Sequence, residues 1–229
     1  MRVAALAFAL AVAVPVAHAA AAPKAPAPVK AVGSVELADA AGDMGPITTS
    51  DGTEPPLDVV KLVLKSDGTR LTAAATLAGP PGRFADSAVE LFVDTDNDVG
   101  TGAKLMRGDV PGFEFMVQVR MCIDYADKSA SCAGGSSRSK PVKWWGAVDV
   151  KRYKGNDEFD REDVVESLGF PGTKASVKTP MAGQVVEASV DYSDLKVKPG
   201  QTIRILAREA GGNPKDGNGD FPVVLLTLK

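Results

Sequence analysis

The chain is poor in histidine, cysteine and aromatic residues, and its charges nearly balance. It has 229 residues with one His, two Cys, 6% aromatic residues and a formal net charge of −3. The single His, His18, lies in a segment that we expect to be removed, which would leave the mature protein without imidazole. This excludes His-ligated zinc, haem held by His, and Ser–His or Cys–His nucleophile pairs. The small net charge provides no basic field to attract nucleic acid or an anionic membrane.

The first 19 residues are organised like a secretory signal peptide. Arg2 precedes an apolar run over residues 3–16, which is too short for a permanent membrane anchor. Residues 17–19 (AHA) then match the small-residue cleavage pattern, so we expect cleavage before Ala20. The alternative is a buried N-terminal helix. The sequence thus predicts a periplasmic or secreted protein that does not span a membrane after cleavage.

Residues 20–32 are dominated by Ala, Pro and Lys. This composition predicts an extended, semi-rigid linker that cannot bury a core, with a merely tolerated disordered terminus as the alternative. Residues 33–229 are then expected to form the folded domain, because 45% hydrophobic residues are ample for a packed core.

The two cysteines, Cys122 and Cys132, are separated by nine residues. In an oxidising compartment, the simplest interpretation of such a pair is one local disulfide that pins a hairpin. A redox site is less well supported because the sequence has no C-x-x-C motif. A metal site is less well supported again, because His partners are missing.

The hydrophobic pattern has a period of two along most of the chain from Leu57 onward. Such alternation, with turn residues about every ten positions, predicts an all-β, antiparallel two-sheet β-sandwich in a single domain. A closed barrel is the alternative. The only segment that looks helical is residues 160–168. The expected strands are residues 60–65, 71–77, 89–93, 113–121, 142–153, 184–191, 202–209 and 222–228.

An acidic loop follows the expected strand that ends near Val93. Asp94, Asp96 and Asp98 alternate there, and the Gly residues that follow let the loop bend. Crowded carboxylates repel one another unless a cation neutralises them, and hard oxygen ligands suit Ca²⁺. An EF-hand is rejected, because Leu105 occupies the position of its bidentate Glu and a strand precedes the loop. Calcium is therefore the expected cofactor, in a structural role.

Two further loops offer weaker calcium candidates. Asp216, Asn218 and Asp220 repeat the spacing of two near the C-terminus, and Asp39 and Asp43 lie near the start of the domain. The alternative is that these are ordinary turn residues, because Asp, Asn and Gly are favoured in any turn.

Four segments of the chain together match a known family pattern, namely the motif D-x-x-G-D-x-G at residues 39–45, the hairpin at residues 55–77, VELFVDTDNDVGTG from residue 89, and the segment at residues 185–209. With these segments, the chain resembles the secreted DOMON-like sandwiches related to carbohydrate-binding module family 9, in particular the C-terminal binding module of glucodextranase-type proteins. This resemblance implies a two-sheet sandwich, a structural calcium near the acidic loop, and binding of glycans or cell-envelope material instead of catalysis.

The resemblance also assigns roles to individual residues, with two departures. It places metal ligands at Asp94, Asp96 and Asp98, and Asp43 matches its opening acidic motif. The Tyr-rich continuation of that motif is replaced here by Ile-Thr-Thr at residues 47–49. Haem-binding DOMON relatives use His and Met ligands, and the mature chain offers no His, so haem is not expected.

A glycan site usually needs aromatic faces that stack on sugar rings. Trp144 and Trp145 are adjacent in an expected strand, so one should enter the core and the other face outward. An exposed Trp near Tyr153 would form a platform for a sugar. The alternative is that all three residues pack inside the protein or at its rim.

Two functional hypotheses follow. The first is a non-catalytic, calcium-stabilised binding module for carbohydrate or envelope glycan. The second is a structural or protein-interaction sandwich of the periplasm or cell surface with no glycan ligand. An enzyme is not expected, because the paired carboxylates lie in hydrophilic loops with nothing apolar nearby to raise a pKa.

Overall fold

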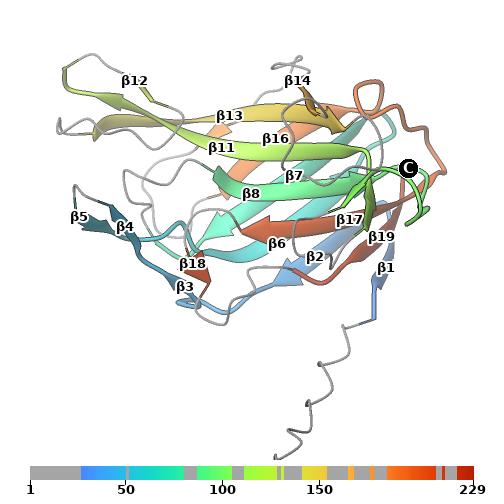
Figure 1. Cartoon of the computed structure of the whole chain (residues 1–229), viewed down its shortest axis with the longest axis horizontal. Coiled ribbons are helices and arrows are strands. Elements are labelled where there is room, and N and C mark those ends of the chain that lie inside the picture. Colours follow the sequence, from blue (N-terminus) through green and yellow to red (C-terminus); the bar gives the residue numbers. More distant parts are fainter. Residues whose placement is uncertain are drawn as a thin grey trace, which may run out of the picture.

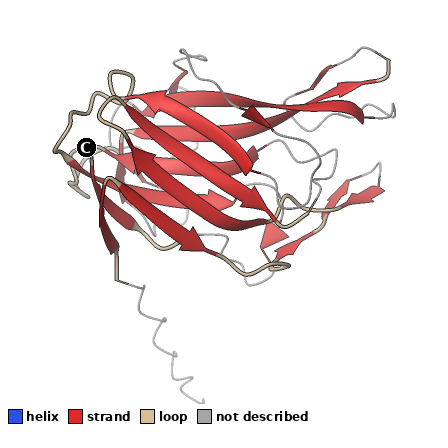
Figure 2. Cartoon of the chain, turned by 180° about the vertical axis from the view of Figure 1, so that it is seen from behind, coloured by secondary structure: helices blue, strands red, loops and turns tan. Residues whose placement is uncertain are grey.

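Two β-sheets pack face to face in a computed structural model of the chain (Figure 1), as the alternating pattern predicts. The structure describes residues 27–49, 52–79, 87–104, 111–127, 130–131, 141–153, 165–167, 176–177, 185–209, 213–214 and 221–229. Figure 2 shows the described part as strands and loops, with no helix among these residues. The all-β sandwich is therefore confirmed.

The larger sheet has eight strands, and its neighbouring strands are antiparallel except at one edge. Its order is β1-β19-β17-β8-β11-β13-β14, and β12 also pairs with β11. The bounds are β1 Val29–Val32, β8 Ser87–Asp94, β11 Phe115–Tyr125, β12 Ala130–Ser131, β13 Pro141–Tyr153, β14 Val165–Ser167, β17 Thr202–Glu209 and β19 Val224–Thr227.

The smaller sheet has five strands in the order β15-β16-β7-β6-β2. Its bounds are β2 Ser34–Ala38, β6 Val59–Ser66, β7 Arg70–Leu77, β15 Ser176–Val177 and β16 Val185–Asp191. Between β6 and β7, the side chain of Asp67 accepts hydrogen bonds from the backbone N–H groups of Thr69 and Arg70 at 2.9 and 2.8 Å. These bonds fix the predicted hairpin turn and hold the pKa of Asp67 below its usual value.

Three short strand pairs lie outside the two sheets. They are β3 (Met44–Gly45) with β18 (Asn213–Pro214), β4 (Ile47–Thr49) with β5 (Gly52–Glu54), and β9 (Ala103–Lys104) with β10 (Pro111–Phe113). In Figure 1, β3, β4, β5 and β18 gather at the end of the sandwich opposite the C-terminus.

The main core lies between the two sheets. Alternate residues of β6, β7 and β16 meet alternate residues of β8, β11, β13, β17 and β19 there, and most of these side chains are 0–2% exposed. A second, smaller cluster contains Phe92 and Phe113, whose ring centroids are 4.9 Å apart, together with Tyr153. Phe92 alternates with the core residues Leu91 and Val93, so this cluster lies on the outer face of the larger sheet.

Two segments differ from the sequence prediction. The last four residues of the expected linker, Val29–Val32, form β1, which pairs in parallel with β19. Val29 and Ala31 pack against the core, and the N–H of Val29 donates to the carbonyl of Val223 at 2.7 Å. Within the segment that looked helical, Val165–Ser167 forms β14 against the end of β13. In both cases, pairing with a sheet edge decides the structure of a few residues whose own pattern is ambiguous.

Several expectations concern the N-terminal region. The predicted signal peptide, residues 1–19, and residues 20–26 of the linker lie outside the described residues. The described residues contain no helix long and apolar enough to cross a membrane.

Cys122 lies in β11, and β12, the strand that ends just before Cys132 in the sequence, pairs with β11 as the predicted hairpin requires. β11 and β12 are antiparallel, with Ile123 opposite Ser131 and Asp124 opposite Ala130. The side chain of Cys122 and all of Cys132 lie outside the described residues, so the disulfide stays a prediction. Its two cysteines directly adjoin the Ile123–Ser131 pair in the sequence.

Candidate functional site

The acidic loop begins at a buried carboxylate. Asp94 is the last residue of β8 and only 1% exposed, and it pairs across the sheet with Arg204 of β17. The Nη2 atom of Arg204 lies 2.8 Å from Oδ2 of Asp94, and its Nε donates to the same oxygen at 3.0 Å. Nη2 also donates to the carbonyl of Gly112 at 3.0 Å. The guanidinium thus connects the end of β8 to the strand pair β9–β10.

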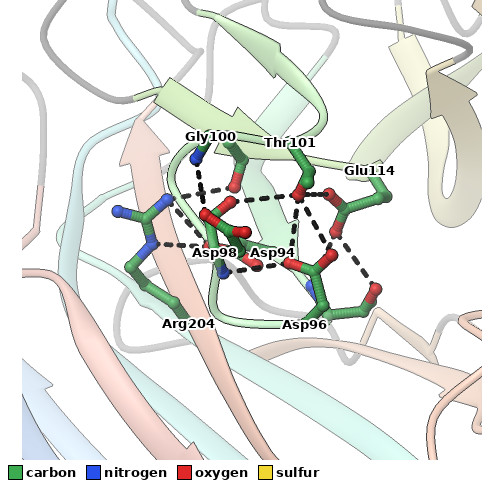
Figure 3. A network of polar contacts seen from close by, with 9 residues as sticks. Asp94, Asp96, Asp98, Gly100, Thr101, Glu114 and Arg204 are labelled. Atoms are coloured by element: carbon green, nitrogen blue, oxygen red, sulfur yellow. Dashed lines mark hydrogen bonds and ion pairs between the residues drawn. The ribbon is translucent and has the colours of Figure 1, made fainter.

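Beyond Asp94, the loop is held by its own side chains. Oδ1 of Asp96 accepts a hydrogen bond from the N–H of Asp98 at 2.9 Å, and Oδ1 of Asp98 accepts one from the N–H of Gly100 at 2.8 Å. The hydroxyl of Thr101 lies 3.0 Å from Oδ2 of Asp96. These contacts curl the loop so that Asp96 turns back toward Asp94, as Figure 3 shows.

Glu114, at the bend between β10 and β11, completes the site. Its Oε2 accepts hydrogen bonds from the backbone N–H and the hydroxyl of Thr95 at 2.7 and 3.0 Å. In Figure 3, Glu114 and Asp96 lie on the side of Asp94 away from Arg204. The sequence places Glu114 only on the polar side of an alternating strand. Glu114 follows the buried residue Phe113 and lies 20 residues beyond Asp94. Nothing in the nearby sequence therefore indicates that Glu114 lies close to Asp94.

Asp94, Asp96 and Glu114 together form the acidic-loop cluster. Each offers a carboxylate oxygen that lies within 4.8 Å of the others. The Oδ1 atom of Asp94 is buried and has no hydrogen-bond partner. Burial is the main cause that raises the pKa of Asp94 to about 6; the charge of Arg204 opposes this rise, and the charge of Glu114 adds to it. The cluster therefore combines three close carboxylates with one unsatisfied buried oxygen.

This finding corrects one sequence argument. The loop was predicted to hold carboxylates with nothing apolar nearby to raise a pKa, but Asp94 adjoins the core residue Val93 and is itself buried. The structure also groups the carboxylates differently from the predicted ligand set. Asp98 is exposed and outside the acidic-loop cluster, because its carboxylate caps Gly100 instead.

Two glycines allow the loop to pack closely against β10. Gly102 has a φ of +68°, and a Cβ placed on it would lie 2.5 Å from the carbonyl oxygen of Phe113 and 2.6 Å from Oε1 of Glu114. Gly112 has a φ of +78°, and a Cβ there would lie 2.7 Å from the carbonyl oxygen of Asp98. Only glycine combines this left-handed backbone with such close contact. The bend expected at Gly102 is confirmed, and Gly112 is a further requirement.

A threonine to valine substitution tests this loop. Oγ1 of Thr101 lies within hydrogen-bond distance of Asp96, of Glu114 and of the carbonyl of Asp98, at 3.0–3.3 Å. Thr101→Val is expected to lower the free energy of unfolding by about 1 kcal/mol, because it removes the hydroxyl donor among these acceptors. Urea unfolding measures the change. Thr202→Val is the control, since its hydroxyl pairs with that of Thr227 at an exposed site, and equal losses in both variants would contradict the prediction.

Asp39 and Asp43, the predicted N-terminal acidic pair, do not belong to the same group of carboxylates in the structure. Asp43 joins a different group, with Asp58 and Glu209, whose carboxylate oxygens also lie within 4.8 Å of one another. Asp39 is outside this group but beside it. Its pKa is raised by burial and by the charges of Asp43 and Asp58, although the N–H of Ala40 donates to its Oδ1 at 2.8 Å.

Other predicted site residues are only partly visible. Asp216, Asn218 and Asp220 lie outside the described residues. Trp144 and Trp145 belong to β13, but their side chains also lie outside what the structure describes. Tyr153 is 5% exposed and packs edge-on against Phe113 in the outer cluster, at 5.2 Å between centroids. The structure therefore places Tyr153 inside the protein, not on an exposed platform.

Comparison with known proteins gives a distant likeness to solved structures. No protein-family model matches the chain, and no curated protein matches it. Among solved structures, it is similar to a carbohydrate-binding module of family 9 from Caldicellulosiruptor kristjanssonii, determined in complex with cellotriose. The similarity has a TM-score of 0.35 and 13% sequence identity, and it covers 89% of this chain and 95% of the other. A likeness this distant assigns neither a family nor a ligand.

Proposed function

We propose that this protein is an exported, non-catalytic binding module whose acidic-loop cluster holds a structural Ca²⁺. Two observations carry the proposal together: carboxylate oxygens of Asp94, Asp96 and Glu114 lie within 4.8 Å of one another, and the buried Oδ1 of Asp94 lacks a hydrogen-bond partner. Buried carboxylate oxygens need a donor or a cation, and Ca²⁺ accepts six to eight oxygens in flexible geometry.

The donor set fits calcium better than other common metals. All three side chains offer carboxylate oxygens, which are hard ligands typical of Ca²⁺ and Mg²⁺. The irregular loop, shaped by its own hydrogen bonds, suits the flexible shell of Ca²⁺ more than the strict octahedron of Mg²⁺. In this role, Asp94, Asp96 and Glu114 would hold the ion, and the ion would tie the end of β8 to the start of β11.

The non-catalytic part of the proposal is supported by how these carboxylates are engaged. Asp94 is bound by Arg204, Asp96 by its own loop, and Glu114 by Thr95. Each group is thus fixed by structural contacts, which favours a role in holding the loop.

As the ligand of the module we propose a carbohydrate or envelope glycan. The resemblance of the sequence to family 9 binding modules supports this, as does the adjacent tryptophan pair in β13. Stacking of one indole on a sugar ring contributes on the order of 1 kcal/mol, so loss of that ring should weaken binding about fivefold.

The glycan proposal is tested with Trp144→Ala and Trp145→Ala. Isothermal titration with cello-oligosaccharides and with soluble envelope polysaccharides should show about fivefold weaker binding for one of the two variants. The matching Trp→Phe variants are the controls, because they keep an aromatic face. If no polysaccharide binds the unaltered protein while a protein partner co-purifies with it, the sandwich is an interaction module and the glycan proposal is wrong.

A further inference from the structure

A second group of carboxylates lies where three separate parts of the chain meet. Asp43 immediately precedes β3, Asp58 immediately precedes β6 of the smaller sheet, and Glu209 is the last residue of β17 in the larger sheet. One carboxylate oxygen from each lies within 4.8 Å of the others. We call these three residues the inter-sheet cluster. It joins the loop before β3 to both sheets at one end of the sandwich.

Glu209 is the most deeply buried member, and one of its carboxylate oxygens lies within 4.8 Å of those of Asp43 and Asp58. It is 4% exposed, and its Oε1 accepts a hydrogen bond from the N–H of Val59 at 3.0 Å. Its Oε2 is buried and has no hydrogen-bond partner. The Oδ1 atoms of Asp43 and Asp58 are in the same state, although the other oxygen of Asp58 accepts a bond from the N–H of Gly42 at 2.6 Å.

These unsatisfied oxygens are confined to two places. Within the part of the chain that the structure describes, the buried side-chain oxygens or nitrogens without a hydrogen-bond partner number four. Three belong to the inter-sheet cluster and the fourth is Oδ1 of Asp94 in the acidic-loop cluster. No described Lys or Arg forms an ion pair with the inter-sheet cluster. Buried polar atoms are normally satisfied, so this distribution points to a missing partner at both places.

We propose that Asp43, Asp58 and Glu209 bind a second divalent cation, Ca²⁺, which fastens the loop before β3 to both sheets of the sandwich. Three carboxylates provide up to six hard oxygen ligands, enough for most of a calcium shell. The cation supplies the positive charge that no described side chain supplies there. Its role is to close this end of the sandwich, where the bond between Val59 and Glu209 also joins the two sheets.

The inter-sheet cluster is separate from the acidic-loop cluster. Glu209 pairs with Val89 near the start of β8, whereas Arg204 pairs with Asp94 at its end. These two pairs are five residues apart on β8, which corresponds to about 17 Å along a strand. One ion cannot serve both clusters, so each can be removed without the other.

Metal counting distinguishes the two sites. The purified mature protein is stripped with EDTA, dialysed to equilibrium against Ca²⁺, and analysed for bound calcium by mass spectrometry of the metal. We expect two equivalents per chain, and one in Glu209→Gln or in Asp58→Asn. Glu187→Gln, at an exposed position of β16, is the control and should keep both equivalents.

The outcomes separate this inference from the proposed function. If Asp94→Asn loses an equivalent and Glu209→Gln does not, the inter-sheet site is wrong and the acidic-loop site stands. If only Glu209→Gln and Asp58→Asn lose calcium, the inter-sheet site is right and the acidic-loop site is wrong. If Glu209→Gln raises the melting temperature without calcium and leaves calcium binding unchanged, the cluster holds a proton and the inference is overturned. Far-UV circular dichroism confirms that each variant is folded before it is counted.

Discussion

Chelation of divalent cations with EDTA is expected to lower the melting temperature of the protein, and added Ca²⁺ is expected to restore it in proportion to the logarithm of its concentration. An ion that binds only the folded state stabilises it by about 2.7 kcal/mol at a hundredfold excess over Kd, and by about 4.1 kcal/mol at a thousandfold excess. The reason is that three carboxylates lie close together and that one of their oxygens, the buried Oδ1 of Asp94, has no hydrogen-bond partner. Differential scanning calorimetry over a calcium series measures the effect.

Two aspartates of the same loop provide a matched comparison. Asp94→Asn should remove the part of the calcium response that the acidic-loop cluster contributes, because Asp94 is buried at its centre. Asp98→Asn should leave that response intact, because Asp98 is exposed and caps Gly100. If both variants lose the calcium response equally, Asp98 is also a ligand, as the sequence predicts. If neither EDTA nor Ca²⁺ changes the melting temperature, the proposed calcium site is wrong.

The sandwich could be predicted because its long strands carry their own pattern. In β7, Leu71, Ala73, Ala75 and Leu77 are buried and the residues between them are half-exposed, so burial follows the sequence with a period of two. Strands of two to four residues carry no such period. β1 and β14 form because a neighbouring strand offers them hydrogen-bond partners. The partner of β1 is β19, which is remote from it in the sequence.

In the candidate sites, only residues that lie close together in the sequence could be predicted. Asp94 and Asp96 stand out because they are close in sequence and follow an apolar strand. Glu114, Asp58 and Glu209 do not, because each ends or precedes a strand as charged residues commonly do. Glu209 meets Val59 across 150 residues of chain. Only the register of β17 against β8, and the facing of the two sheets, bring such residues together.

Replacement of Arg204 by methionine is expected to lower the free energy of unfolding by about 3–5 kcal/mol in the absence of calcium, because it leaves a buried carboxylate without its partner. The side chain of Arg204 is 14% exposed and that of Asp94 is 2% exposed, so solvent screens this pair little. Arg70→Met is the control. Its pair with Asp191 is 40% and 39% exposed, and its loss should cost about 1 kcal/mol or less. Chemical unfolding of both variants after EDTA treatment measures the difference, and equal losses would contradict the prediction.

The same substitution also reports on calcium at Asp94. Arg204 and a bound Ca²⁺ would share this carboxylate from opposite sides, one through Oδ2 and the other through Oδ1. Removing the guanidinium takes away a positive charge that repels the ion, so Arg204→Met should bind Ca²⁺ more tightly while being less stable without it. Saturating Ca²⁺ should then recover part of the lost stability, since either cation neutralises Asp94. If calcium affinity is unchanged and the loss of stability is the same with and without Ca²⁺, then Arg204 is the sole counterion of Asp94 and the loop is held by an ion pair alone.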